Sequence, residues 1–119
     1  MTMSSFDARY SAHHPVAVKV VTVTVPDNGT NAETDVEMNG LIKQLHFITP
    51  ALDAADTAEL VLHNADDKVL YASGEKAEST SSVINVERAV CGVVTFRVEC
   101  SASQEDAISN VFTVYVYYV

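Results

Sequence analysis

Apolar and polar residues alternate along several stretches of this chain, and that alternation constrains the fold more than any other feature. In GVVTFRVEC (92–100), every second residue from Val94 to Cys100 is apolar and the residues between them are polar or charged. Successive side chains of a β-strand point to opposite faces, so the pattern predicts a strand with one buried face. The 19 valines, against 6 leucines and 4 isoleucines, also favour strands because β-branched residues suit a pleated sheet. We therefore predict an all-β protein.

The first predicted strand, VAVKVVTVTV (16–25), contains a break in this alternation. Valines occupy even positions up to Val20 and odd positions from Val21 onward. A shift of one residue moves the apolar side chains to the other face of a strand, unless a bulge absorbs the extra residue. We predict a bulge at this point, or a strand that passes from one sheet to the other.

Polar segments separate the other predicted strands, which lie at 41–50, 58–64, 68–73, 82–90, 92–100 and 111–119. The segment PDNGTNAETDVEMNG (26–40) is expected to be a polar connection, and a short helix is the alternative for LIKQLHFITP (41–50). Short strands at this spacing predict an antiparallel two-sheet β-sandwich, Ig-like, with about seven strands. We expect a single β-sandwich domain at 16–119, preceded by an extended N-terminal arm at 1–15.

The final segment, VFTVYVYYV (111–119), is apolar on both sides and carries no charge. A sandwich strand normally needs only one apolar face, so we expect the arm or another protein chain to cover the second. Aromatic side chains are enriched where apolar patches meet a protein partner. We therefore predict a partner interface made by the arm and the outer side of this strand. Its candidate residues are Phe6, Tyr10, His13, His14, Thr113, Tyr115, Tyr117 and Val119.

The charge balance restricts the possible partners. The chain has 16 acidic and 7 basic residues, a formal net charge of −9, which argues against nucleic acid and against an anionic membrane surface. No stretch approaches the roughly 20 apolar residues of a membrane helix. The N-terminus lacks a basic start followed by an apolar stretch, so we expect no secretory signal and a protein made in a cytoplasm.

Histidines and acidic residues offer little chemistry in this sequence. His13 and His14 would point in opposite directions in an extended chain, and His46 and His63 fall on separate predicted strands, so no zinc site is expected. The acidic residues within 26–40 lack the spacing of a calcium-binding loop. The sequence contains no nucleophile elbow, phosphate-binding glycine loop or metalloprotease helix. We therefore predict no metal, no cofactor, no catalytic residue and no enzyme activity.

The two cysteines, Cys91 and Cys100, occupy opposite ends of one predicted strand. Nine steps of about 3.3 Å place them roughly 30 Å apart, whereas a disulfide needs Cα atoms within about 7 Å. They cannot pair with each other, and both are expected to be buried or half-buried thiols.

The order of motifs resembles that of small structural proteins of tailed bacteriophages. A glycine-led strand and a Pro-containing loop (GLIKQLHFITPALDAADT) precede a hairpin that ends in LYASG, the strand CGVVTFRVEC and the apolar terminal segment FTVYVYYV. The resemblance covers roughly residues 36–119. It implies a virion component assembled in the host cytoplasm, with capsid decoration or cement as the leading role and the major capsid protein or other virion proteins as partners. A homo-oligomer is compatible with it.

Two other functions stay open at this point. The same sandwich suits a head–tail connector or a tail component. A carbohydrate- or receptor-binding module exposed on the particle is the third possibility, because tyrosine rings can stack on sugar rings.

Overall fold

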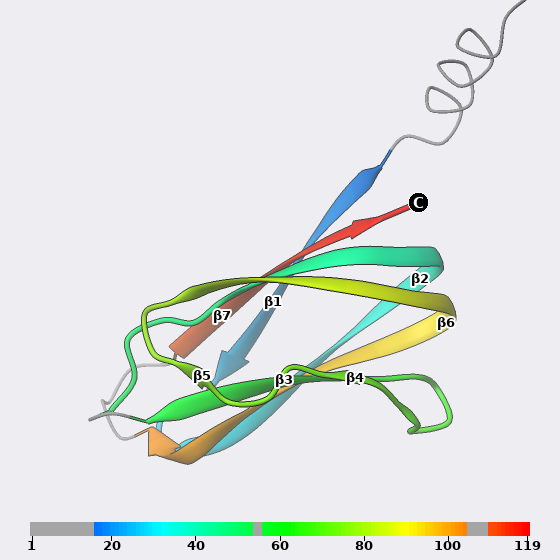
Figure 1. Cartoon of the computed structure of the whole chain (residues 1–119). Helices are drawn as coiled ribbons and strands as arrows, with labels where there is room; N and C mark the ends of the chain where they lie inside the picture. Colours follow the sequence, from blue (N-terminus) through cyan, green and yellow to red (C-terminus); the bar gives the residue numbers. More distant parts are fainter. Residues whose placement is uncertain (1–15, 54–55, 105–109) are drawn as a thin grey trace, which may run out of the picture.

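The computed structural model describes residues 16–53, 56–104 and 110–119, and these form an antiparallel all-β fold (Figure 1). The strands are β1 (Ala17–Val25), β2 (Gly29–Ile48), β3 (Thr57–His63), β4 (Val69–Ala72), β5 (Lys76–Ala77), β6 (Ser81–Gln104) and β7 (Asn110–Tyr118). Neighbouring strands follow the order β1-β7-β2-β6-β3-β4, and β5 pairs with β3. The predicted arm at 1–15 lies outside the described residues.

The two longest strands, β2 and β6, each contribute to both layers of the molecule. They pair with each other along nearly their whole length, and Figure 1 shows both of them turning back at the same end of the molecule. Each has a glycine with positive φ close to this turn, Gly40 at 142° and Gly92 at 93°. Glycine adopts such a backbone at little steric cost, so the paired strands bend together at these positions. The register shifts just beyond the bend, between Ile42 and Gln44.

Two sequence predictions about these strands are wrong. The segment 26–40 is mostly strand rather than a polar connection, because Glu33, Asp35 and Glu37 alternate with inward residues and form the charged side of β2. Residues 82–90 and 92–100 belong to one strand, since the bend at Gly92 does not interrupt the pairing of β6 with β2. The helical alternative for 41–50 is excluded, because β2 runs through it to Ile48.

When both halves of β2 and β6 are counted, eight strands form two four-stranded sheets. The first sheet contains β1, β7, the C-terminal half of β2 and the N-terminal half of β6. The second contains the N-terminal half of β2, the C-terminal half of β6, β3 and β4. The predicted antiparallel β-sandwich is confirmed. Its strand order, with the first strand beside the last, is the jelly-roll variant of the two-sheet architecture that immunoglobulin domains also have.

The core lies between the two sheets and is apolar. Phe47, Phe96 and Phe112 are fully buried, and the rings of Phe47 and Phe112 stack with centroids 6.0 Å apart. Burial follows the alternation seen in the sequence, since Val94 and Val98 are buried beside Phe96 as predicted. Inward residues of seven strand segments therefore hold the two sheets together by hydrophobic packing.

The predicted bulge or sheet crossing in β1 is wrong. β1 pairs with β7 along its whole length without a register shift. Val21 faces the core and is 2% exposed, whereas Val20 faces outward and is 56% exposed. In the N-terminal half of β1 an inward position is held by Lys19, whose Nζ donates to the Glu37 carbonyl oxygen at 3.5 Å. The valines at even positions therefore lie on the outside of the sandwich.

A fully buried glutamine, Gln104, joins several segments at one end of the sandwich. Its Oε1 accepts hydrogen bonds from the Asp53 backbone N–H at 3.0 Å and from Asn110 Nδ2 at 3.4 Å. Its Nε2 donates to Asp56 Oδ2 at 3.1 Å and to the Ala102 carbonyl oxygen at 3.0 Å. Because every polar atom of the side chain has partners, this buried amide stabilises the end of the sandwich.

Candidate protein-interaction surface

The outer side of the first sheet carries only one pair of charged side chains among its described residues, Lys43 and Glu87 at the end near the bend. We call the rest of this side the uncharged face. It is formed by the outward residues of four strands, together with Val16, which precedes β1, and Val119, which follows β7. Its members are Val16, Val18, Val20, Thr22, Thr24, Gln44, His46, Ile48, Ser81, Val83, Asn85, Val111, Thr113, Tyr115, Tyr117 and Val119. A side of this size whose only charges in the described strands, Lys43 and Glu87, neutralise each other contrasts with the net charge of −9.

An aromatic cluster occupies the centre of the uncharged face. Val20 lies opposite Tyr115, Tyr115 opposite His46, and His46 opposite Val83, so one row of side chains crosses four strands. The His46 ring meets the Tyr115 ring edge-on at a centroid distance of 6.4 Å and the Tyr117 ring at 5.5 Å. Cross-strand neighbours of this kind pack against one another. The aromatic rings therefore lie between the valines of β1 on one side and Val83 of β6 on the other.

The valines of this face are open to solvent. Val18 and Val20 on β1 are 52% and 56% exposed, Val83 on β6 is 59% exposed, and Val111 on β7 is 49% exposed. Single exposed valines are ordinary in soluble proteins. Here the exposed valines occur on three strands, and half-buried Tyr115 and His46 link Val20 to Val83 across the sheet. Contiguous apolar patches of several hundred Å² mark interaction surfaces.

The structure brings half of the predicted interface residues together. Thr113, Tyr115 and Tyr117 are half-buried on the uncharged face, and Val119 is 41% exposed at its end. The other predicted members, Phe6, Tyr10, His13 and His14, lie outside the described residues. The second apolar side of the last strand is therefore present as predicted, and no described segment buries it.

Sequence reasoning missed the contributions of β1, β2 and β6 to this face. The signal for β1 is the doublet Val20–Val21. It marks apolar residues on both sides of a regular strand and not the predicted bulge. His46 and Val83 gave no such signal, because their position depends on which strands become neighbours. Only the strand order reveals that they complete the surface.

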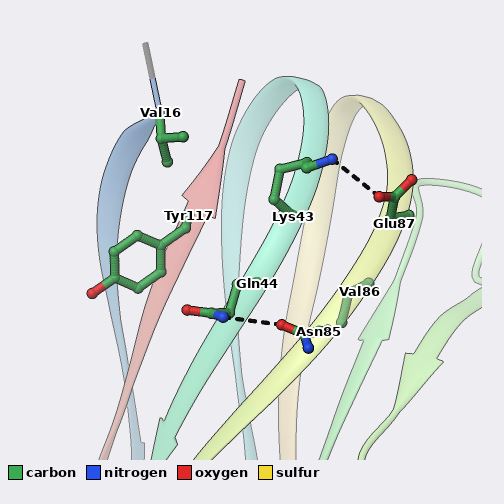
Figure 2. Close-up of a pocket in the computed structure, with 7 residues that line it drawn as sticks. All are labelled: Val16, Lys43, Gln44, Asn85, Val86, Glu87 and Tyr117. Carbon is green, nitrogen blue, oxygen red and sulfur yellow. Dashed lines mark hydrogen bonds and ion pairs between the residues drawn. The ribbon is translucent and has the colours of Figure 1, made fainter. Parts of the chain in front are cut away.

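A hollow of about 570 Å³ lies at one end of the uncharged face, where β2 has a bulge. Its lining residues are Val16, Lys43, Gln44, Asn85, Val86, Glu87 and Tyr117 (Figure 2). Lys43 Nζ forms an ion pair with Glu87 Oε1 at 3.0 Å, and Gln44 Nε2 donates to Asn85 Oδ1 at 3.0 Å. Because the charged groups pair with each other, the hollow has no net charge and combines an aromatic wall with hydrogen-bonding amides.

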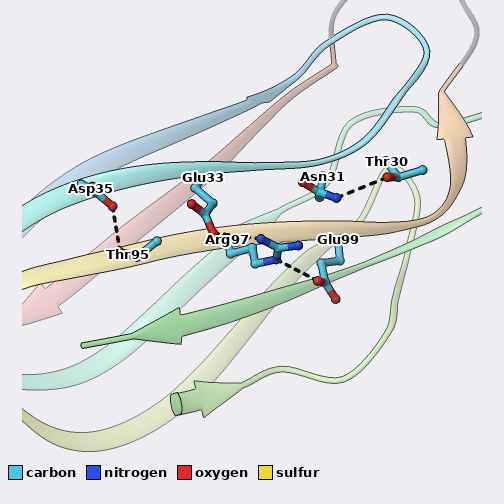
Figure 3. A network of polar contacts seen from close by, with 7 residues as sticks. All are labelled: Thr30, Asn31, Glu33, Asp35, Thr95, Arg97 and Glu99. Atoms are coloured by element: carbon cyan, nitrogen blue, oxygen red, sulfur yellow. Dashed lines mark hydrogen bonds and ion pairs between the residues drawn. The ribbon is translucent and has the colours of Figure 1, made fainter. Parts of the chain in front are cut away.

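The outer side of the second sheet has the opposite character (Figure 3). Arg97 contacts Glu99 Oε1 through Nε at 2.8 Å and Glu33 Oε2 through Nη1 at 2.9 Å. These hydrogen bonds raise the pKa of Arg97, that with Glu99 contributing most. Thr95 Oγ1 donates to Asp35 Oδ1 at 2.7 Å on the same side. The molecule therefore has one charged, solvated side and one uncharged side.

The histidines and cysteines do not gather into a chemical site in the described part of the chain. His46 and His63 lie on the outer sides of different sheets, and no three His, Cys, Asp or Glu side chains among the described residues could hold a metal ion. Cys91 and Cys100 are free thiols. Cys100 is half-buried as predicted, but Cys91 is exposed, because it lies at the bend of β6. Within the described ranges the structure has no helix that could span a membrane.

Comparison with known proteins identifies the fold but no family. No protein family matches the chain, and no curated protein matches its sequence. Among solved structures, a chain of the cyanophage Pam1 capsid is similar, with 20% identity and a TM-score of 0.54 over 87% of this chain and 86% of that one. A chain of the Bacillus endospore appendages, which form disulfide-linked pili, has 10% identity and a TM-score of 0.53 over 89% of each chain. Likeness at these identities establishes a shared β-sandwich fold.

Proposed function

We propose that the chain is a non-enzymatic structural protein of a phage virion, and that it decorates or cements the capsid shell. One observation carries the proposal: a protein of net charge −9 has an uncharged face that crosses four strands and exposes its valines. Such a face is stabilised when another protein surface covers it, because burial removes apolar area from water.

Two likenesses support a place in the virion. Residues 36–119 resemble small structural proteins of tailed phages in the order of their motifs. The fold is also that of a chain in the cyanophage Pam1 capsid. In this proposal the chain is a virion component, and the major capsid protein or another virion protein is its partner.

The contacts with neighbouring chains of the virion, further copies of this chain included, are assigned to two parts of the molecule. One is the uncharged face with Tyr115 and Tyr117 at its centre. The other is the arm, residues 1–15, which carries the predicted contact residues Phe6 and Tyr10. The charged outer side of the second sheet faces solvent in this arrangement, which keeps the protein soluble before assembly and repels nucleic acid and anionic lipid.

The copy number of the chain in purified particles of the phage that encodes it tests this proposal. Decoration predicts a copy number comparable to that of the major capsid protein, measured by quantitative mass spectrometry, and density on the outer shell in a particle map. A much smaller number confined to the head–tail junction or the tail would make the chain a connector or tail component. Absence from particles would contradict a virion role altogether.

The hollow beside Tyr117 favours a second candidate function, recognition of a carbohydrate or receptor by a module exposed on the particle. A tyrosine wall next to paired amides suits a neutral polyhydroxylated ligand. Binding on a glycan array that is lost in Tyr117→Ala and retained in Tyr115→Ala would support it, since Tyr115 lies on the same strand and face but outside the hollow. Equal binding by both variants would exclude the hollow as the site.

A further inference from the structure

We propose that the uncharged face is covered by the same face of a second copy of this chain, so that the free protein is a two-fold symmetric dimer. This inference goes beyond the proposed function, because it concerns the protein in solution before any shell is present. It leaves the arm of each copy available for another virion protein.

The distribution of charge permits two copies to meet through this face although each has a net charge of −9. The acids of β2, including Glu33 and Asp35, and Glu99 of β6 lie on the outer side of the second sheet. In a face-to-face pair these sides are separated by three sheet spacings of about 10 Å each, or roughly 30 Å. That separation exceeds the Debye length of about 8 Å at physiological salt, so repulsion between the acidic sides is largely screened.

The area of the face is sufficient for a specific but weak dimer. Four strands spaced about 4.8 Å apart give a width of roughly 19 Å, and nine residues at about 3.3 Å give a length of roughly 30 Å. Two faces of about 570 Å² bury on the order of 1,100 Å², just above the roughly 1,000 Å² expected of a biological interface and below the typical 1,600 Å². An interface at the low end of this range is typical of a reversible association, so we expect a dimer that dissociates on dilution.

The composition of the face suits self-pairing. A two-fold axis brings the same patch of both subunits together, so the aromatic cluster of Tyr115, Tyr117 and His46 would meet its own copy at the centre. Central aromatic residues surrounded by less critical contacts are the usual arrangement of interface hot spots. The outward valines, such as Val18 and Val20, would pack around this centre as the side chains of two stacked sheets do.

Sedimentation velocity of the full chain across a range of concentrations tests the dimer. We expect a concentration-dependent shift from monomer to dimer with no larger species. Val20→Asp is expected to weaken the dimer at least tenfold, because it places a carboxylate in the buried face. Val93→Asp is the matched control, since Val93 is also an outward valine, 39% exposed, on the outer side of the second sheet. It is expected to leave association unchanged, and circular dichroism confirms that both variants are folded.

A charge exchange makes the test specific to self-pairing. Tyr115→Asp and Tyr115→Lys are each expected to be monomeric alone, and an equimolar mixture of the two is expected to regain the dimer, because opposite charges then meet near the two-fold axis. Variants that still dimerise on their own would show that the dimer uses another surface. Mixtures that stay monomeric while the native chain dimerises would show that the two copies of Tyr115 do not meet across a two-fold axis, and either result would overturn the proposal.

Three further results would also overturn it. These are a full chain that is monomeric at every concentration, an open series of oligomers, and association that appears only after residues 1–15 are removed, which would mean that the arm covers its own face. A monomer that is nevertheless abundant in particles would remove the dimer and leave the proposed function intact. A dimer that is absent from particles would contradict the proposed function alone.

Discussion

Replacement of Gln104 by leucine is expected to destabilise the fold strongly, although leucine has nearly the same volume and suits a buried position. The amide is fully buried and takes part in four side-chain hydrogen bonds. Gln104→Leu removes all four hydrogen bonds. The Asn110 side-chain amide then loses its acceptor, although Asn110 is only 5% exposed. The half-buried carboxylate of Asp56 can recruit water instead.

The expected cost follows from these partners. A buried polar group that loses its hydrogen bond costs about 1–3 kcal/mol. The buried Asn110 amide and the part-buried Asp53 N–H together give at most about 2–6 kcal/mol. Urea denaturation measures the change. With a slope of about 1–3 kcal/mol per molar urea, a loss of about 3 kcal/mol lowers the unfolding midpoint by roughly 1–3 M.

Two further variants distinguish the stability contributed by the buried hydrogen bonds of Gln104 from the cost of replacing a glutamine elsewhere. Gln44→Leu is the matched control, because Gln44 makes one solvent-exposed side-chain bond, to Asn85, and we expect it to cost less than about 0.5 kcal/mol in dilute solution. Gln104→Glu keeps the shape but places a second carboxylate next to Asp56, so its cost is expected to be larger at neutral pH than in mild acid. If Gln104→Leu proved no more destabilising than Gln44→Leu, the buried network would contribute nothing and the reasoning would be refuted.

Three other changes have defined outcomes. Gly40→Ala is expected to lower the urea midpoint, because a Cβ there would collide with the carbonyl oxygen of Val119 and φ is +142°; an unchanged midpoint would contradict the close approach. Burial raises the pKa of the Cys100 thiol from 9.0 to about 11, so the unfolded chain loses this proton first and stability falls as pH rises from about 9 to about 11. Cys100→Ala is expected to reduce that fall in pH-dependent denaturation, and Cys91→Ala to leave it unchanged. Arg97→Gln is expected to cost less than about 1 kcal/mol in the same assay, because both acidic partners of Arg97 are nearly half exposed to solvent. A larger loss would show that these ion pairs stabilise the fold.

Local alternation was sufficient to predict the strands that contribute most of the core. It placed Phe96 and Phe112 inside and Tyr115 outside, because a period of two fixes the face of each side chain once a strand is recognised. The alternation failed to predict a strand at 26–40. The inward residues that alternate with Glu33 and Asp35 there are small or polar, so the sequence resembles a loop. The hydrophobic signal is weak at such positions because the inward residues lie near the rim of the core.

The candidate surface was only half predictable, for a different reason. The sequence shows that Val20 and Tyr115 have apolar neighbours, but it does not show that their strands lie side by side. Strand order depends on which distant segments pair, and β2 joins β7 and β6 across the same face. Tertiary pairing, and not local preference, therefore created the four-strand row that ends at Val83.

The pairing of distant segments also determines when this chain can fold. β2 pairs with β6 at Ala32 and Val98, which are 66 positions apart (98 − 32), and β1 pairs with β7 at Ala17 and Tyr118. Closing loops of this length costs entropy before the contacts compensate for it, and folding dominated by such contacts takes milliseconds to seconds. The second sheet needs only strands that end by Gln104, whereas the first sheet cannot be completed until β7 has been synthesised. During synthesis the two layers therefore become available one after the other, with the layer that carries the aromatic cluster last.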